Sequence, residues 1–250
     1  MPDDSAHTSH DDHAALFVTT RWSLVLSARD KVSPDSERAL ESLCRAYWYP
    51  LYVFVRRRGH QPHDAQDFTQ AFFARLLEKD FLNAVSQEKG RFRTFLVVAL
   101  KRFLLNEWDK VRTQKRGGGQ QLLPLDGENA EYRYQAEHAD ALSAEAMFER
   151  RWALTLLEQA MTRLRTSYAE TRREAEFEHL KGSLTADRGE VDYAQIARAL
   201  GMSEGAARVA LHRLRKRFRE FFREEIAGTV SDPADVDDEV RHVVALISRG

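Results

Sequence analysis

The fold is constrained most by residues 191–223, which read VDYAQIARALGMSEGAARVALHRLRKRFREFFR. Apolar residues recur at helical spacing from Tyr193 to Leu200, and this spacing predicts a short helix with one buried face. Gly201 follows at a point where the helix can stop, because glycine enters the left-handed conformation without steric cost. Ser203 can then cap a second helix by accepting a free backbone amide with its hydroxyl. The stretch therefore predicts two helices joined by a tight turn.

The second predicted helix separates apolar residues from cations. Its apolar stripe consists of Ala207, Leu211, Leu214 and Phe218, and arginines and lysines crowd the remaining surface. A helix that is apolar toward its neighbour and cationic toward solvent is typical of a recognition helix in the major groove of DNA. The alternative is an amphipathic helical hairpin with a solvated charged face. Because the tight turn and the basic cluster coincide, the pattern favours DNA binding.

The net charge of −1 is an average over segregated segments. Acidic residues gather in 1–12, 126–145 and 232–239, and basic residues gather in 101–116 and 208–223. Separate basic patches can bind nucleic acid even when the total charge is close to zero. Hydrophobic residues make up 43% of the 250 residues, which is enough to build real cores.

Several classes of protein are not expected. Cys44 is the only cysteine, so the sequence predicts neither a disulfide framework nor a thiolate metal cage. No apolar run approaches the roughly 20 residues that cross a bilayer, and the acidic N-terminus lacks the features of a signal peptide. No nucleophile–base pair, carboxylate dyad or metal cage has supporting spacing. We therefore expect a cytoplasmic protein that is not an enzyme, has no membrane contact and binds no cofactor or metal.

Helical periodicity continues along the rest of the chain and predicts an all-α protein. The expected helices cover residues 20–28, 40–55 with a kink at Pro50, 62–81, 91–112, 146–164, 166–184 and 231–248. Residues 113–145 contain three successive glycines and few apolar anchors, and this composition predicts a flexible linker.

The chain resembles the sigma-70 family, specifically the extracytoplasmic-function (ECF) sigma factors of bacterial RNA polymerase. In region 2 of that family, an acidic DAED-type helix start and a Q-x-x-F step precede G-x-F-x-x-[WF]-L and a basic helix. Here these motifs correspond to residues 64–67, 70–73, 90–96 and 101–116. The two-helix stretch resembles region 4, whose S-E-G-x-x-x-x-x-L-x-R pattern is matched by Ser203, Glu204, Gly205, Leu211 and Arg213.

The resemblance implies two small helical domains joined by a flexible linker. The expected boundaries are 1–18 for a disordered tail, 19–112 for region 2, 113–145 for the linker, 146–226 for the region 4 helix-turn-helix and 227–250 for a C-terminal helical extension. The extension is expected to cap the domain core, and partner binding is the alternative.

The resemblance also implies a function in transcription initiation. Such a factor binds core RNA polymerase at the beta-prime clamp and the beta flap, and it directs promoter recognition and melting. The residues expected to bind the polymerase are Asp64, Asp67, Gln70, Phe73 and Arg75. The residues expected at the single-stranded minus-10 element are Phe92, Lys101, Arg102, Asn106, Trp108, Lys110 and Arg112. The residues expected at the minus-35 duplex are Ser203, Arg208, Val209, His212, Arg213, Arg215 and Lys216. Among them, Ser203, Arg215 and Lys216 are expected to contact phosphates, and the others are expected to face the major groove.

The polymerase-binding helix departs from the family pattern, because Gln66 and Ala71 occupy positions that are commonly Glu. A phosphate on Thr69 would restore about −1.5 to −2 units of charge. We therefore hypothesise that a Ser/Thr kinase activates this protein through Thr69, in place of release from an anti-sigma factor. The alternative is that Thr69 is an ordinary residue of the helix surface.

Two other functions stay open at this point. The first is a helix-turn-helix regulator that binds duplex DNA without polymerase, which would leave the aromatic and basic helix near Trp108 unexplained. The second is a helical metalloenzyme that uses His60, His63 and neighbouring carboxylates.

Overall fold

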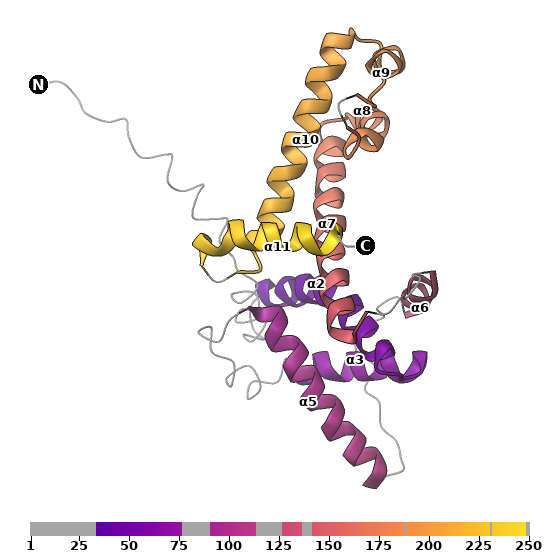
Figure 1. Cartoon of the computed structure of the whole chain (residues 1–250), viewed down its shortest axis with the longest axis vertical. Helices are drawn as coiled ribbons and strands as arrows, with labels where there is room; N and C mark the ends of the chain where they lie inside the picture. The colour runs from indigo at the N-terminus through magenta and orange to yellow at the C-terminus, as the bar shows by residue number, and fades with distance from the viewer. Residues whose placement is uncertain are drawn as a thin grey trace, which may run out of the picture. The chain divides into compact units, whose positions relative to one another are not determined.

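The computed structural model describes residues 34–76, 91–113, 127–136, 142–187, 189–230 and 232–248, with the backbone alone for 34–43, 108–113 and 127–128. Every regular element in these ranges is a helix (Figure 1), which confirms the predicted all-α class. No helix among the described residues is long and apolar enough to cross a membrane. The predicted tail at 1–18 and the predicted helix at 20–28 lie outside the described residues.

The chain divides into two compact units. Unit 1 comprises Met1–Thr155 and Ala227–Gly250, and unit 2 comprises Leu156–Ile226. This division differs from the predicted boundaries at two points: residues 146–155 belong to unit 1, and so does the C-terminal segment. Unit 2 is therefore an insertion whose two ends both continue into unit 1.

Unit 1 contains α2 (Pro34–Arg57), α3 (Pro62–Leu76), α5 (Phe92–Thr113), α6 (Gly127–Ala136), the first part of α7 (Ala144–Glu170), the short 3-10 turn η3 (Pro233–Asp235) and α11 (Val236–Ser248). Aromatic side chains join the first three of these helices. The ring of Tyr47 on α2 meets Phe92 edge-on at 5.4 Å, and Phe72 on α3 meets Phe103 at 5.7 Å. These contacts place the apolar stripes of α2, α3 and α5 in one core.

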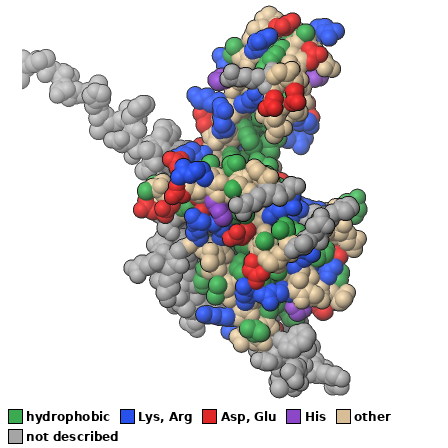
Figure 2. All heavy atoms as spheres, viewed as in Figure 1, with side chains coloured by type: hydrophobic (Ala, Val, Ile, Leu, Met, Phe, Trp, Pro, Cys, Tyr) green, Lys and Arg blue, Asp and Glu red, His purple; other side chains and the backbone are tan. Residues whose placement is uncertain are grey.

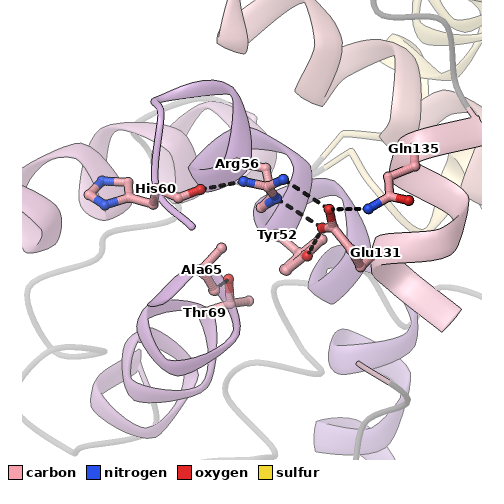
Figure 3. Close-up of polar contacts among 7 residues, drawn as sticks. All are labelled: Tyr52, Arg56, His60, Ala65, Thr69, Glu131 and Gln135. Atoms are coloured by element: carbon pink, nitrogen blue, oxygen red, sulfur yellow. Dashed lines mark hydrogen bonds and ion pairs between the residues drawn. The ribbon is translucent and has the colours of Figure 1, made fainter. Parts of the chain in front are cut away.

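The α6 helix corrects the prediction of a flexible linker at 113–145. Its Ala130 is buried, and Glu131 accepts two hydrogen bonds of 2.9 Å from the guanidinium of Arg56 on α2. Tyr52 on α2 also donates to Glu131, as Figure 3 shows. The local composition favours a loop, but this ion pair with a distant helix supplies free energy that the composition does not reveal. Residues 114–126 and 137–141 of the predicted linker lie outside the described residues.

Unit 2 contains the rest of α7, α8 (Glu174–Leu180), the 3-10 turn η2 (Lys181–Ser183), α9 (Tyr193–Leu200) and α10 up to Ile226; α10 itself spans Glu204–Ala227. Figure 1 shows these four α-helices. Apolar residues from all four form one core. The buried residues include Leu164, Tyr168, Leu180, Leu211 and Leu214. The charged segment 166–183 thus packs into this unit through Tyr168, Phe177 and Leu180, because its apolar residues fall on one side.

Candidate nucleic-acid interface

The turn between α9 and α10 has the local structure that its sequence predicts. The Asp192 carboxylate caps α9 by accepting the Gln195 amide at 2.9 Å. Gly201 ends α9 with φ 64° and ψ 33°, a left-handed conformation that a Cβ would strain. The Ser203 hydroxyl then accepts the Ala206 amide at 3.2 Å and starts α10. Ser203 is exposed, so its O–H is still available to donate outward.

One face of α10 combines cations with a single apolar side chain. Five predicted minus-35 residues are exposed on it: Arg208, Val209, His212, Arg213 and Lys216. Their spacing of i, i+1, i+4, i+5 and i+8 puts them on one side of the helix. The opposite side is buried in the core of unit 2. We call these five residues the α10 face; Figure 2 shows basic side chains along unit 2.

Arg208 on this face is held from α9. Its guanidinium lies over the ring of Tyr193, 4.6 Å from the ring centre, which is a cation–π contact. The contact crosses the turn between the two helices and limits the directions in which Arg208 can point. Sequence reasoning assigned Tyr193 to the buried stripe alone, and no spacing rule would have paired it with Arg208.

Arg215 corrects the predicted set of phosphate contacts. It follows Arg208 by about two turns of α10, but its guanidinium donates to the carbonyl oxygen of Ser183 at 2.6 Å and to that of Ala186. The side chain is half-buried against the segment that follows α8. Arg215 therefore closes the turn after η2 and is not presented to DNA.

A second exposed stripe runs along α5. Val98 is 42% exposed and Leu105 is 68% exposed, and they alternate with the exposed Arg102 and Asn106. The spacing of i, i+4, i+7 and i+8 places all four on one helix face, which we call the α5 stripe. Sequence reasoning found the two polar residues but missed the two apolar ones, because apolar residues on a helix are ordinarily assigned to the core.

Other predicted minus-10 residues have different positions. Phe92 is 1% exposed and packs on Tyr47, so it belongs to the core and cannot stack on a base. Lys101 is half-buried and pairs with Glu145 on α7 at 2.7 Å. Trp108, Lys110 and Arg112 continue the backbone of α5, and their side chains are outside the described part of the structure.

A cavity of about 410 Å³ lies beside the α5 stripe. It is lined by Arg58, His60, Lys101, Leu104 and Leu105. The Glu145 carboxylate spans two of these cations, since it also accepts from Arg58 at 3.2 Å. The hydrogen bond from Lys101 lowers the pKa of Glu145, and the carboxylate therefore stays ionised at this site.

The predicted polymerase-binding residues on α3 are divided between surface and core. Asp64 and Asp67 are exposed, and an oxygen of the Asp67 carboxylate lies 3.3 Å from the Nδ1 of His63. Gln70 and Arg75 are half-buried. Phe73 is buried and packs on Phe72, so it cannot serve as an apolar anchor for a partner, contrary to the prediction.

Thr69 does not lie on the surface of α3. Its side chain is 0% exposed, and its hydroxyl donates to the carbonyl oxygen of Ala65 at 2.7 Å, as Figure 3 shows. A kinase could not reach this hydroxyl while α3 is packed, and a phosphate would not fit in the core. The structure thus removes the premise of the phosphorylation hypothesis. The misplacement arose because Thr69 is polar and its neighbours Phe68 and Gln70 are only half-buried.

The histidines of α3 and the turn before it have ordinary partners. The His60 ring meets Phe68 edge-on at 5.1 Å, and burial lowers its pKa. His63 points to Asp67 on the same helix. No group of three or more His, Cys, Asp or Glu residues that could hold a metal ion occurs among the described residues. The geometry therefore offers no support for the metalloenzyme alternative.

Comparison with known protein families gave one informative result. The ECF sigma factor family matches residues 30–224, which run from before α2 to within α10. No curated protein and no solved structure gave a match. The matched span contains α3, the α5 stripe and the α10 face, and it covers most of the chain. On this match, together with the helix-turn-helix of unit 2, the chain belongs to the ECF sigma factor family.

Proposed function

We propose that this protein binds core RNA polymerase, directs it to particular promoters and helps to melt them. The observation that carries the proposal is the α10 face, which presents Arg208, Arg213 and Lys216 on one exposed side of a capped helix-turn-helix. Membership in the ECF sigma factor family supports the same function.

The α10 face would bind the minus-35 duplex. Arginine can donate two hydrogen bonds to the major-groove edge of guanine, and the Tyr193 contact orients Arg208 for such a role. His212 lies between the two arginines and can donate or accept. Lys216 is well exposed, so it is suited to a phosphate, as is the hydroxyl of Ser203.

The α5 stripe would hold the single-stranded minus-10 element. Val98 and Leu105 offer apolar surface to unstacked bases, and Arg102 offers a charge to the backbone. Asn106 can donate to and accept from a base edge. These residues replace Phe92 in the set expected from the sequence.

The exposed side of α3 would bind the polymerase. Asp64 and Asp67 supply negative charge there, and the small side chain of Ala71 lies between them and the end of the helix on the exposed surface. Close approach of a partner helix is easier over Ala71 than over a long side chain. Because Thr69 is buried, an anti-sigma factor replaces the kinase as the proposed regulatory partner.

Transcription by core RNA polymerase on a random promoter library tests the proposal. Wild-type protein should redirect the start sites, and Arg213→Gln should weaken or alter the minus-35 preference. Arg165→Gln is a matched control, because Arg165 is exposed in unit 2 but lies on α7, away from the α10 face.

Two outcomes would contradict the proposal. In the first, the protein neither associates with core polymerase nor changes where RNA synthesis begins. In the second, it binds duplex promoter DNA equally well with and without polymerase and leaves the start sites unchanged. The second outcome would identify a helix-turn-helix regulator that acts without polymerase.

A further inference from the structure

The C-terminal helix α11 packs in unit 1 at the beginning of α5. Its Glu239 is 0% exposed, although most of the neighbouring acidic residues are exposed. Arg93 donates to one carboxylate oxygen of Glu239, and the Nε of Arg91 lies 3.1 Å from the other. Arg91, just before α5, and Arg93, in its first turn, thus converge on a single buried carboxylate.

The position of Arg93 is also set by residues of α7. Its side chain is 3% exposed, and its guanidinium lies 4.4 Å from the centre of the Trp152 ring on α7. Glu149 on the same helix is 3.9 Å away, too far for a strong ion pair. The aromatic ring holds the guanidinium in place and leaves its charge to be balanced chiefly by Glu239. Two guanidiniums that converge on one point can bind a carboxylate or a phosphate there through charge-assisted hydrogen bonds.

Arg91 lies in line with the α5 stripe. Val98 and Arg102 follow it by seven and eleven residues, close to two and three turns of an α-helix. Its side chain is 42% exposed, so it faces outward while it contacts Glu239. Arg91 therefore extends the surface that we assign to the minus-10 strand, whereas Arg93 is buried while α11 is docked.

The carboxylate comes from outside the part of the chain that is shared with the family. The family match ends at residue 224, so it includes both arginines and excludes Glu239. The start of α11 is also acidic, with Asp235, Asp237 and Asp238 exposed, and Figure 2 shows acidic side chains gathered there. A segment of this charge could not remain docked while an anionic strand occupied the same arginines.

We propose that Arg91 and Arg93 form a phosphate-binding subsite for the promoter strand, and that Glu239 fills this subsite in the free protein. Docking of α11 and binding of the strand then exclude each other. The inference rests on the proposed function, because it takes the strand to be the minus-10 DNA along α5. It adds two features to that function: a phosphate-binding subsite at residues that the sequence analysis did not select, and a carboxylate of the same chain that competes with DNA for this subsite.

Hydrogen exchange of the full-length wild-type protein tests the competition directly. A fluorescein-labelled single-stranded DNA of mixed sequence should speed up exchange at the amides of α11 as the DNA saturates the protein. Inorganic phosphate at the same ionic strength should leave exchange at α11 unchanged, which distinguishes a strand from a free anion. Unchanged exchange at α11 with the DNA fully bound would overturn the proposal.

Variants test the residues involved. Glu239→Gln should bind the labelled DNA at least about fivefold more tightly, and its salt dependence should steepen by about 0.7 for each phosphate gained. Asp238→Asn is the matched control: it removes the same charge from the same helix, but Asp238 is exposed and pairs with Arg241 on its own helix. It should change affinity less than about twofold. Adding Arg91→Gln to Glu239→Gln should abolish the gain.

The results separate this inference from the proposed function. If wild-type protein and Glu239→Gln both direct core polymerase to promoters with equal DNA affinity, the competition is absent and the proposed function stands. If Asp238→Asn tightens binding as much as Glu239→Gln, the effect is general electrostatics and the subsite is refuted. If no variant directs the polymerase at all, the proposed function itself fails.

Discussion

Replacing Arg215 by glutamine distinguishes two roles for this side chain. In the sequence-based expectation, Arg215 contacts a DNA phosphate. In the structure, it donates to the carbonyl oxygens of Ser183 and Ala186 and closes the turn after η2. Glutamine is shorter and uncharged, so Arg215→Gln removes both hydrogen bonds while it retains a polar side chain.

The magnitude follows from the geometry. Hydrogen bonds from a charged donor contribute about 1.5–3 kcal/mol each when they are well formed. The value here lies at the low end, since the side chain is half-buried and both acceptors can be rehydrated. The Nε of Arg215 is buried without a hydrogen-bond partner, which offsets part of the gain. We therefore expect a loss of about 2 kcal/mol in the local stability of the segment from α8 to α9.

Hydrogen exchange of the full-length protein measures this loss. A decrease of about 2 kcal/mol in the free energy of local opening speeds up exchange by about 30-fold. The effect should appear at the amides of η2 and α9. Binding of duplex DNA, measured as a function of salt, should keep the slope of the wild type, because no phosphate contact is lost.

Lys216→Gln is the matched comparison, since Lys216 neighbours Arg215 but is exposed on the α10 face. It should leave exchange unchanged and reduce the salt slope by about 0.9, the value for one phosphate on duplex DNA. If Arg215→Gln reduces the salt slope by about 0.9 and leaves the amides of η2 as protected as in the wild type, Arg215 contacts a phosphate and does not stabilise this turn.

Three further predictions concern single contacts. Tyr193→Leu should weaken duplex binding about threefold by freeing Arg208, in line with the roughly 0.5–1 kcal/mol of an exposed cation–π contact; fluorescence anisotropy measures it. Thr69→Asp should destabilise unit 1 by more than about 3 kcal/mol in urea unfolding, because it buries a carboxylate without a partner. Low pH should weaken the packing of α6 on α2. Burial alone would raise the pKa of Glu131, but hydrogen bonds from Arg56 and Tyr52 outweigh it and lower the pKa. The free energy that Glu131 contributes to this packing is thus fully present at neutral pH and is lost as the pH falls below the usual carboxylate pKa of 4.5. Hydrogen exchange at the amides of α6, measured as a function of pH, tests this loss.

Each of these predictions has a control. Tyr193→Phe keeps the aromatic face and should bind as the wild type does, and Tyr193→Leu should have no effect once Arg208 is glutamine. Thr69→Val keeps the shape and loses one hydrogen bond, so it should cost only about 1 kcal/mol. Glu131→Gln should remove the acid transition of α6. Equal stability of Thr69→Asp and wild type, or an acid transition that survives Glu131→Gln, would contradict the corresponding argument.

The α10 face shows how far a local pattern can predict a site. Arg208, His212 and Arg213 are exposed on one side, as expected, because the buried stripe of a helix leaves its opposite side open. Arg215 is also cationic, and the sequence pattern does not distinguish it from the neighbouring cations that are exposed to DNA. Its role depends on carbonyl groups some 30 residues earlier, which come near only when unit 2 folds.

The same limit applies to the aromatic residues of unit 1. Phe73 and Phe92 have the aromatic surface that a partner or an unstacked base requires. In the folded protein, however, burying this surface in the core of unit 1 is more favourable in free energy than leaving it exposed to solvent. On α5 it is the aliphatic Val98 and Leu105 that are exposed. Periodicity identifies which residues share a helix face; it does not say which face the other helices cover.

The sequence by itself determined the helical class, the capped turn between α9 and α10, and membership in the family, because these depend on local spacing and on motifs. Tertiary structure alone decided that α6 docks on α2, that Thr69 is buried, and that Glu239 closes on Arg91 and Arg93. The physical reason is the separation along the chain over which each interaction acts. Helix propensity and capping act over a few residues, whereas these contacts join groups that are far apart in the chain, and their free energy exists only where the fold excludes water around them.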